Sequence, residues 1–252
     1  MTRSTLLLIF ATTVSLLFSA ISPAAAFDHS HSAFTAVLKQ HVKGPRFDYA
    51  ALKSDPKGIE SYLTSLAAVK ESEFKGWSEK QQIAFLANLY NAATLKLVID
   101  HYPVKSIKDI GGVFSGPWKQ KVVDLFGEKT TLDNVEHGLL RVNYSEHRVH
   151  FAVNCASVGC PNLRAEAFQA DKLDSQLDEQ GRVFLSDKTR NRVEGGTLYL
   201  SPIFDWFGGD FTKKGSLADF VAPYFPEADR AAIKGGKLKV KFTDYDWSLN
   251  KS

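Results

Sequence analysis

The hydrophobic and polar positions along this chain predict one long buried helix as its central element. From residue 83 to residue 99, apolar side chains occur on nearly every side of a helical projection. A helix that is apolar all round is enclosed by the rest of its domain. Ser78, followed three positions later by Gln81, predicts a capping box at its start, and Pro103 predicts its end.

Two asparagines interrupt this apolar surface. Asn88 and Asn91 are three positions apart, so they lie on one face of the helix. Because buried amides need hydrogen-bond partners, two interpretations follow. The first is that they fix neighbouring loop backbone to the helix. The second is that they point into a cleft, where they bind substrate or orient a catalytic group.

Shorter patterns predict helices, hairpins and strands around this central helix. We expect helices over residues 34–42, 58–68, 131–141, 171–185 and 216–225, hairpins over 121–132 and 191–201, a tight aromatic turn over 201–211, and strands over 147–156 and 237–247. The predicted strands occur in hairpins or singly and not in regular βαβ units, and this arrangement favours an α+β fold. We therefore predict an α+β single domain with a buried central helix, several amphipathic helices and a small, mostly antiparallel sheet.

The predicted helix over 131–141 carries a polar stripe. Asp133, His137 and Arg141 recur every four residues, so they share one face. Glu136 lies about 100° away from His137 around the helix. Arg141 would either pair with one of the carboxylates or bind a substrate carboxylate.

The segment HFAVNCASVGCP, residues 150–161, gathers further reactive side chains. It contains both cysteines of the chain, Cys155 and Cys160, together with a histidine and an asparagine. If the expected strand runs straight through, His150 and Asn154 face one side and Cys155 faces the other. The histidine and this cysteine would then meet only if the chain turns.

The first 26 residues predict export. Arg3 precedes an apolar run over residues 6–20, and the run Ala24 to Ala26 provides the small residues that signal peptidase requires. The apolar run is too short to span a bilayer comfortably, and we expect no later segment long and apolar enough to do so. We therefore predict a signal peptide over 1–26, a single globular domain over 27–252 without a membrane span, and a secreted or periplasmic location.

Composition narrows the class of protein. The 31 basic and 28 acidic residues nearly cancel, which argues against a nucleic-acid binder. Hydrophobic residues make up 44% of the chain, enough to build a core. We expect His29, His31 and His41 to be solvated. The expected partner is an unknown small-molecule or peptide ligand, and the sequence leaves the oligomeric state undetermined.

Five motifs together resemble domain-of-unknown-function family 547, which includes bacterial secreted proteins. The motifs are NLYNA at 88–92, LDNVEHGLLR at 132–141, HFAVNCASVGCP at 150–161, LSPIFDWFGGDF at 200–211 and DYDWSLN at 244–250. They occur over nearly the whole mature chain. The resemblance implies one domain and one shared polar site, and it brings no established activity.

One interpretation of the cysteines is a catalytic thiol. A cysteine nucleophile needs a lowered pKa, which a histidine or a helix N-terminus supplies, and the histidine needs an orienting group. Pro161 favours the first turn of a helix and would leave Cys160 near such an N-terminus. This site would be a hydrolase or acyltransferase acting on an amide, ester or thioester in the cell envelope. The candidate groups are Cys155, or else Cys160, as nucleophile, His137 or His150 as base, and Glu136, Asp133 or Asn154 as the orienting group.

The alternative is a disulfide between Cys155 and Cys160. Two cysteines in an exported protein are usually paired, and closing this short loop would stabilise the fold by about 2 kcal/mol. The protein would then be a non-enzymatic ligand-binding or envelope-interaction domain. A thiol redox protein, in which Cys160 resolves an oxidised Cys155, is a further alternative, although the spacing is not C-x-x-C.

The remaining expectations concern substrate contacts and cofactors. The candidate substrate-binding residues are Asn88, Asn91, Arg141, Asn154 and Asp210. The sequence has no P-loop, no G-x-G-x-x-G and no G-x-S-x-G, and its histidines and cysteines lack the tight spacing of metal ligands. We therefore expect neither a cofactor nor a metal.

Overall fold

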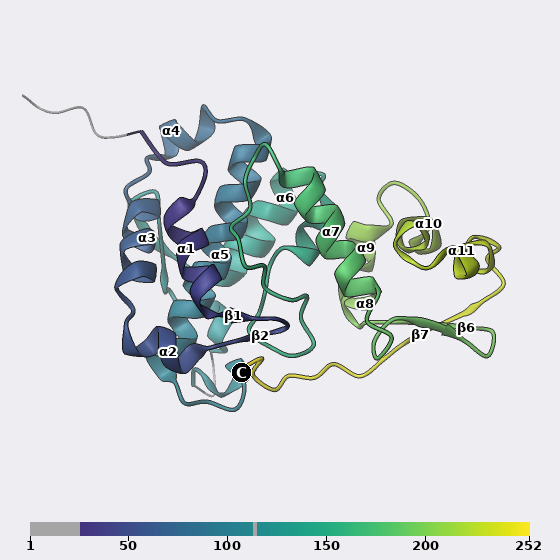
Figure 1. Cartoon of the computed structure of the whole chain (residues 1–252). Helices are drawn as coiled ribbons and strands as arrows, with labels where there is room; N and C mark the ends of the chain where they lie inside the picture. The colour runs from purple at the N-terminus through teal and green to yellow at the C-terminus, as the bar shows by residue number, and fades with distance from the viewer. Residues whose placement is uncertain (1–25, 113–114) are drawn as a thin grey trace, which may run out of the picture.

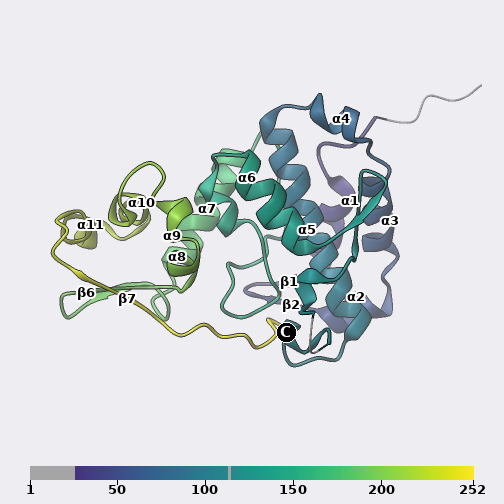
Figure 2. The same cartoon turned by 180° about the vertical axis from the view of Figure 1, so that it is seen from behind.

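The computed structural model describes residues 26–112 and 115–252. The predicted signal peptide lies outside these residues except for Ala26. Figure 1 shows the N-terminal helices gathered on one side and the C-terminal helices and strands on the other, and Figure 2 shows the same division from behind. The last residues return to the N-terminal part, where the Phe47 N–H donates to the Asn250 carbonyl at 2.9 Å and the Phe47 carbonyl accepts from the Ser252 N–H at 3.0 Å.

Helix α5, Glu79–His101, is the central element, as the sequence predicts. Ser78 and Gln81 form the predicted capping box, and every residue from 83 to 95 is buried. The capping box satisfies backbone N–H groups that the first turn of a helix leaves without partners. The apolar surface of α5 therefore becomes the centre around which the other helices pack.

The length and composition of α5 correct one expectation. This helix is long and apolar enough to cross a membrane, although we expected no such segment after the signal peptide. Its most apolar window is 89% buried inside the fold. The core helix of a folded domain has the same composition as a membrane span, because both are surrounded by apolar groups.

The remaining helical elements are mostly short. The α-helices are α1 Ser32–His41, α2 Tyr49–Ser54, α3 Lys57–Ala67, α4 Glu71–Lys75, α6 Arg141–Asn143, α7 Leu173–Leu185, α8 Ile203–Trp206, α9 Gly208–Phe211, α10 Leu217–Val221 and α11 Glu227–Lys234. The 3-10 helices are η1 Ile107–Asp109, η2 Pro117–Lys119, η4 His147–Phe151 and η5 Ala222–Tyr224, and η3 Asn134–Leu140 is a π-helix. Among these, α2, α3 and η3 pack against α5.

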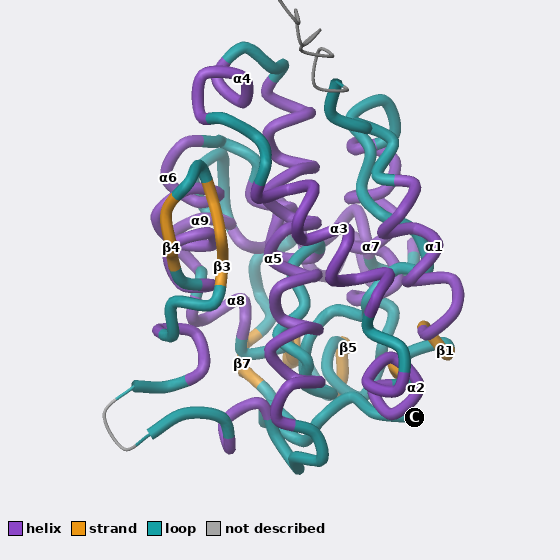
Figure 3. Tube along the Cα trace, turned by 90° about the vertical axis from the view of Figure 1, so that its left-hand side faces the viewer, coloured by secondary structure: helices purple, strands orange, loops and turns teal. Residues whose placement is uncertain are grey.

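The strands form small separate sheets, and Figure 3 shows how short they are beside the helices. Strand β1 (Val42–Lys43) pairs with β2 (Arg46–Phe47), and β3 (Val123–Leu125) pairs with β4 (Glu128–Thr130). Strands β5 (Arg192–Glu194), β6 (Thr197–Leu200) and β7 (Lys239–Phe242) form the third sheet, in which β5 and β6 are antiparallel and β6 and β7 are parallel. The α+β class and both predicted hairpins are confirmed.

Buried apolar side chains form two clusters. The larger one surrounds α5 and includes Leu89 and Val153. The smaller one includes Phe151, Phe204 and Phe211. Because Phe151 and Val153 enter different clusters, the cysteine-bearing segment crosses the boundary between the two cores.

The predicted strand over 147–156 is wrong. Residues His147–Phe151 form the 3-10 helix η4, and the residues after it have no regular structure. Asn91 of α5 bonds the Ala152 carbonyl at 2.9 Å and the Asn154 N–H at 2.8 Å. A neighbouring strand would use the same backbone groups, so the buried amide replaces a strand partner. The alternating apolar pattern arises because the segment reaches into two cores.

Three smaller expectations are also wrong. The aromatic segment 201–211 folds as the short helices α8 and α9, not as a turn. Irregular backbone follows Pro161, so Cys160 does not lie at a helix N-terminus. His31 and His41 are only 1% and 3% exposed, because α1, which follows His31 and ends at His41, packs on the core, and the His31 Nδ1 lies 2.7 Å from the Tyr62 hydroxyl.

Candidate functional site

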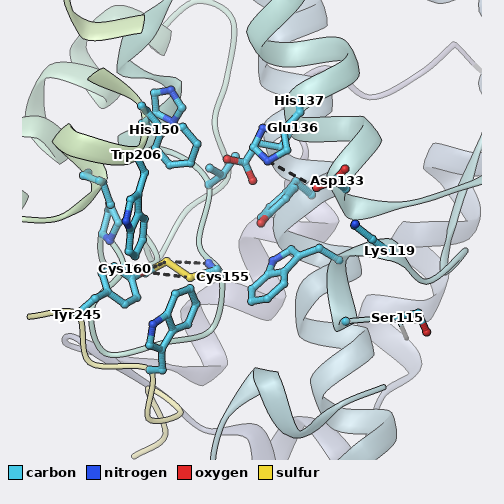
Figure 4. A pocket seen from close by; sticks show the side chains of 18 residues that line it. Ser115, Lys119, Asp133, Glu136, His137, His150, Cys155, Cys160, Trp206 and Tyr245 are labelled. Atoms are coloured by element: carbon cyan, nitrogen blue, oxygen red, sulfur yellow. Dashed lines mark hydrogen bonds and ion pairs between the residues drawn. A yellow bond between two sulfur atoms is a disulfide. The ribbon is translucent and has the colours of Figure 1, made fainter. Parts of the chain in front are cut away.

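A cavity of about 420 Å³ is lined by residues from both core clusters. Figure 4 shows Trp206, Tyr245 and Cys160 on one side of it, and Glu136 and Asp133 on the other. The lining residues that matter for its chemistry are Tyr90, Trp118, Lys119, Asp133, Glu136, His137, His150, Cys155, Cys160, Trp206, Phe207, Tyr245 and Trp247. These side chains come from segments far apart in the sequence, so the fold alone brings them together.

Aromatic rings form much of the cavity wall. The ring centroids of Trp206 and Tyr245 are 4.8 Å apart, and those of Tyr245 and Trp247 are 4.5 Å apart. Trp118 meets Trp247 edge to face at 5.8 Å. Trp206 remains 47% exposed. Rings held against one another in this way give a rigid apolar surface on which a ligand can pack.

Cys155 and Cys160 are joined by a disulfide at this cavity. The Cys155 N–H donates to the Cys160 sulfur at 2.9 Å, and the Tyr245 hydroxyl lies 3.2 Å from each sulfur. Across residues 26–112 and 115–252, neither sulfur forms a hydrogen bond with a histidine. While the disulfide is intact neither sulfur is a nucleophile, so the catalytic-thiol interpretation applies only to a reduced form.

The disulfide loop is held closely from several sides. Asn154 bonds the Pro161 carbonyl at 2.7 Å and the Ala156 N–H at 2.9 Å, which closes the loop from within. Gly159 lies against the Tyr245 ring, where an added Cβ would come within 2.8 Å of ring carbons. Burial raises the pKa of Tyr245 to about 12, so its hydroxyl stays protonated. The loop is therefore a rigid part of the cavity wall.

A buried carboxylate faces this aromatic wall. Glu136 lies in the π-helix η3 and is only 8% exposed. A π-helix is rare and frequently marks a functional site. Burial, and after it the charge of Glu136 and a hydrogen bond to it, raises the pKa of Tyr90 well above its usual value. Tyr90 therefore remains neutral beside the carboxylate.

The predicted polar stripe continues into a network of charged groups. The His137 Nε2 lies 3.6 Å from the Asp133 carboxylate, and its Nδ1 accepts from Arg141 at 2.9 Å. Arg141 also bonds Asp210 at 2.6 Å, and His150 Nε2 meets the same carboxylate oxygen at 2.9 Å. Hydrogen bonds from this histidine and from Arg141 hold the pKa of Asp210 well below its usual range.

The structure separates the predicted site residues into two groups. Six of them line the cavity, namely Asp133, Glu136, His137, His150, Cys155 and Cys160. The other five lie outside its lining, namely Asn88, Asn91, Arg141, Asn154 and Asp210. Asn88 bonds both backbone groups of Phe168, at 2.8 and 2.9 Å, in the way that Asn91 holds the cysteine segment. These contacts are those expected of amides that fix loop backbone to the helix.

The sequence analysis missed the aromatic wall. Trp206 and Tyr245 lie in two of the five motifs, which was the available signal. Aromatic residues are usually core residues, so nothing in the sequence marked these as lining a cavity. Among the described residues, histidine, cysteine and acidic side chains form no group of three that could hold a metal ion.

Comparison with known proteins finds a family model that matches part of the chain. Residues 74–185 match the model of a family described as protein of unknown function, DUF547. No curated protein and no solved structure matches the chain. The matched range contains α5, the π-helix with Glu136 and the disulfide loop, whereas Trp206, Tyr245 and Trp247 lie after it. Residues 74–185 are thus similar to the DUF547 family, and the match covers less than half of the chain.

Proposed function

We propose that this chain is an exported protein, secreted or periplasmic after cleavage near Ala26, that binds a small organic ligand in the aromatic cavity. The cavity carries this proposal. Its volume of about 420 Å³ falls within the range of small-molecule sites, which are mostly apolar with a few placed polar groups. In this function the disulfide braces the wall and does no chemistry.

The exposed aromatic surface at the cavity favours a role in ligand binding over a role in core packing alone. Trp206 leaves 47% of its surface exposed although it lies beside Tyr245 and Trp247. A large exposed ring at a concave site costs solvation free energy that a ligand would recover. The other large exposed aromatic side chain among the described residues, Phe242, lies on strand β7 and does not line the cavity.

Titration with N-phenyl-1-naphthylamine, a neutral dye that fluoresces in apolar surroundings, tests this function. We expect one dye to bind per mature chain. Trp206→Ala should weaken binding about tenfold, because it removes a ring that forms the wall. Phe242→Ala is the matched control, because Phe242 is an aromatic residue of similar exposure (40%) outside the cavity, and it should bind as wild type does. Equal effects of the two substitutions, or no saturable binding, would refute the proposal.

A second candidate is the thiol-dependent hydrolase or acyltransferase, because both sulfurs line the cavity together with His137 and His150. A dithiol reductant would have to open the disulfide first, which leaves two thiols and an oxidised reductant. Reduced protein should then label with an iodoacetamide probe and hydrolyse p-nitrophenyl acetate, and Cys155→Ser should abolish hydrolysis. Hydrolysis that is equal in oxidised and reduced protein would exclude it.

The same reduced protein tests the redox alternative. A redox pair requires Cys155 and Cys160 to exchange with a glutathione buffer and to pass electrons to a disulfide substrate such as insulin. The measurement is insulin reduction with glutathione as electron donor. A rate equal to that of glutathione alone would exclude this function while leaving ligand binding intact.

A further inference from the structure

We infer that the ligand of this cavity is an organic cation, held by its ammonium group between the Glu136 carboxylate and the aromatic rings. This inference rests on the proposed binding function and names the chemical class of its ligand.

The first observation is a buried carboxylate without a cationic partner. Glu136 is 8% exposed and lines the cavity. It takes part in none of the salt bridges formed within residues 26–112 and 115–252. Its neighbour Tyr90 is neutral and offers a hydroxyl but no charge. A buried charge is costly unless a countercharge accompanies it, so a cationic ligand would supply what the protein lacks.

The second observation is that, among the described residues, no cation near Glu136 forms a salt bridge with it. Arg141 bonds Asp210 at 2.6 Å, and Lys213 bonds the same carboxylate at 3.1 Å. Lys119 lines the cavity as well, and it forms no salt bridge with Glu136 in the described part of the chain. Figure 4 shows Lys119 on the same side of the cavity as Asp133. Lys119 is therefore a like charge that a cationic ligand must tolerate.

The third observation is the aromatic wall itself. The faces of tryptophan and tyrosine rings attract ammonium groups, and rings grouped around a cavity recognise quaternary ammonium ligands. One ring already shows this contact, because the Lys108 ammonium lies 3.6 Å from the ring centroid of Trp247. The rings of Trp206 and Tyr245 stand next to Trp247 and across from the carboxylate. Charge and ring faces thus favour the same ligand.

The test compares choline with 3,3-dimethylbutan-1-ol, which has the same shape without the charge. Both are titrated into the mature, oxidised protein at neutral pH, and tryptophan fluorescence and calorimetry report binding. We expect choline to bind at least about tenfold more tightly than the alcohol. Glu136→Gln should remove this preference, whereas Glu128→Gln, an exposed acid on strand β4, should leave it unchanged. Lys119→Gln should tighten choline binding severalfold, because it removes the like charge.

The outcomes separate this inference from the proposed function. Retained dye binding in Glu136→Gln shows that the variant folds and keeps its cavity. If the two probes bind equally, if only the alcohol binds, or if Glu136→Gln has no effect, the cation inference is overturned while the cavity remains a binding site. If the dye binds and choline does not, the same conclusion follows. If neither dye nor choline binds, the proposed function and the inference are both refuted.

Discussion

Replacing either buried asparagine of α5 by leucine tests whether these amides fix the loops or contact a ligand. Asn91→Leu leaves the Ala152 carbonyl and the Asn154 N–H without their partner, and both groups are buried. Asn88→Leu does the same to the two backbone groups of Phe168. The two substitutions are matched in helix, chemistry and burial, and they differ in the loop that they release.

The expected loss of stability follows from the backbone groups that each substitution leaves without a hydrogen-bond partner. An unsatisfied buried donor or acceptor costs about 1–3 kcal/mol, so each substitution, which leaves two such groups, should lower the free energy of unfolding by about 2–6 kcal/mol. This is a large fraction of the stability of a typical domain, about 5–15 kcal/mol. Leucine is close to asparagine in shape, so little of the loss should come from packing.

Urea unfolding of the mature protein, followed by far-UV circular dichroism, measures the loss. Binding of the naphthylamine dye then distinguishes the two positions. Asn91→Leu should also weaken dye binding, because the segment it holds leads to the disulfide loop, whereas Asn88→Leu should leave binding unchanged. A loss below about 1 kcal/mol for both variants would refute the structural role. Full stability with lost binding in Asn91→Leu would instead favour a ligand contact.

Three further predictions concern other parts of the molecule. Burial lowers the pKa of His31 to about 4, so between pH 6.5 and pH 4 the unfolded state binds more protons than the folded state. The contribution of His31 to stability should therefore be complete above pH 6.5 and fall by about 3 kcal/mol as the pH drops to 4. Urea midpoints measured against pH should depend less on pH in His31→Gln than in the wild type. Replacing Cys155 and Cys160 by alanine should cost about 2 kcal/mol in urea unfolding, and reducing the wild type should cost a similar amount; no loss in either would contradict the bracing role. Arg141→Met should cost about 2 kcal/mol, because it removes a charged hydrogen bond from the buried Asp210, and unchanged thermal stability would argue against the network.

Local features of the sequence were sufficient to predict the central helix. The apolar surface over residues 83–99, the Ser78–Gln81 pair and Pro103 predicted α5 almost to its ends, because they act through neighbours along the chain. The two predicted hairpins depended in the same way on short-range turn chemistry. The burial of the two asparagines also followed, since they lie in the middle of a helix that is apolar all round.

The cysteine segment shows where such reasoning fails. Its alternating pattern predicted a strand over 147–156, but Asn91 takes the backbone groups that a strand partner would use. That competition depends on a side chain about sixty positions away, and no local pattern contains it. The sequence also left open whether Cys155 and Cys160 were free or bonded, and the turn of the backbone between them brings the two sulfurs together.

By itself, then, the sequence determined the buried helix, the α+β class and which polar groups the chain contains. Only the tertiary structure decided which groups share a cavity: it brought Trp206 and Tyr245 to the disulfide and to Glu136, and it turned Arg141 and Asp210 towards each other. The physical reason is the sequence separation between the residues that make each kind of contact. Helix caps and turns are set by contacts within a few residues, whereas a cavity is formed by packing between segments that meet only once the whole core has closed.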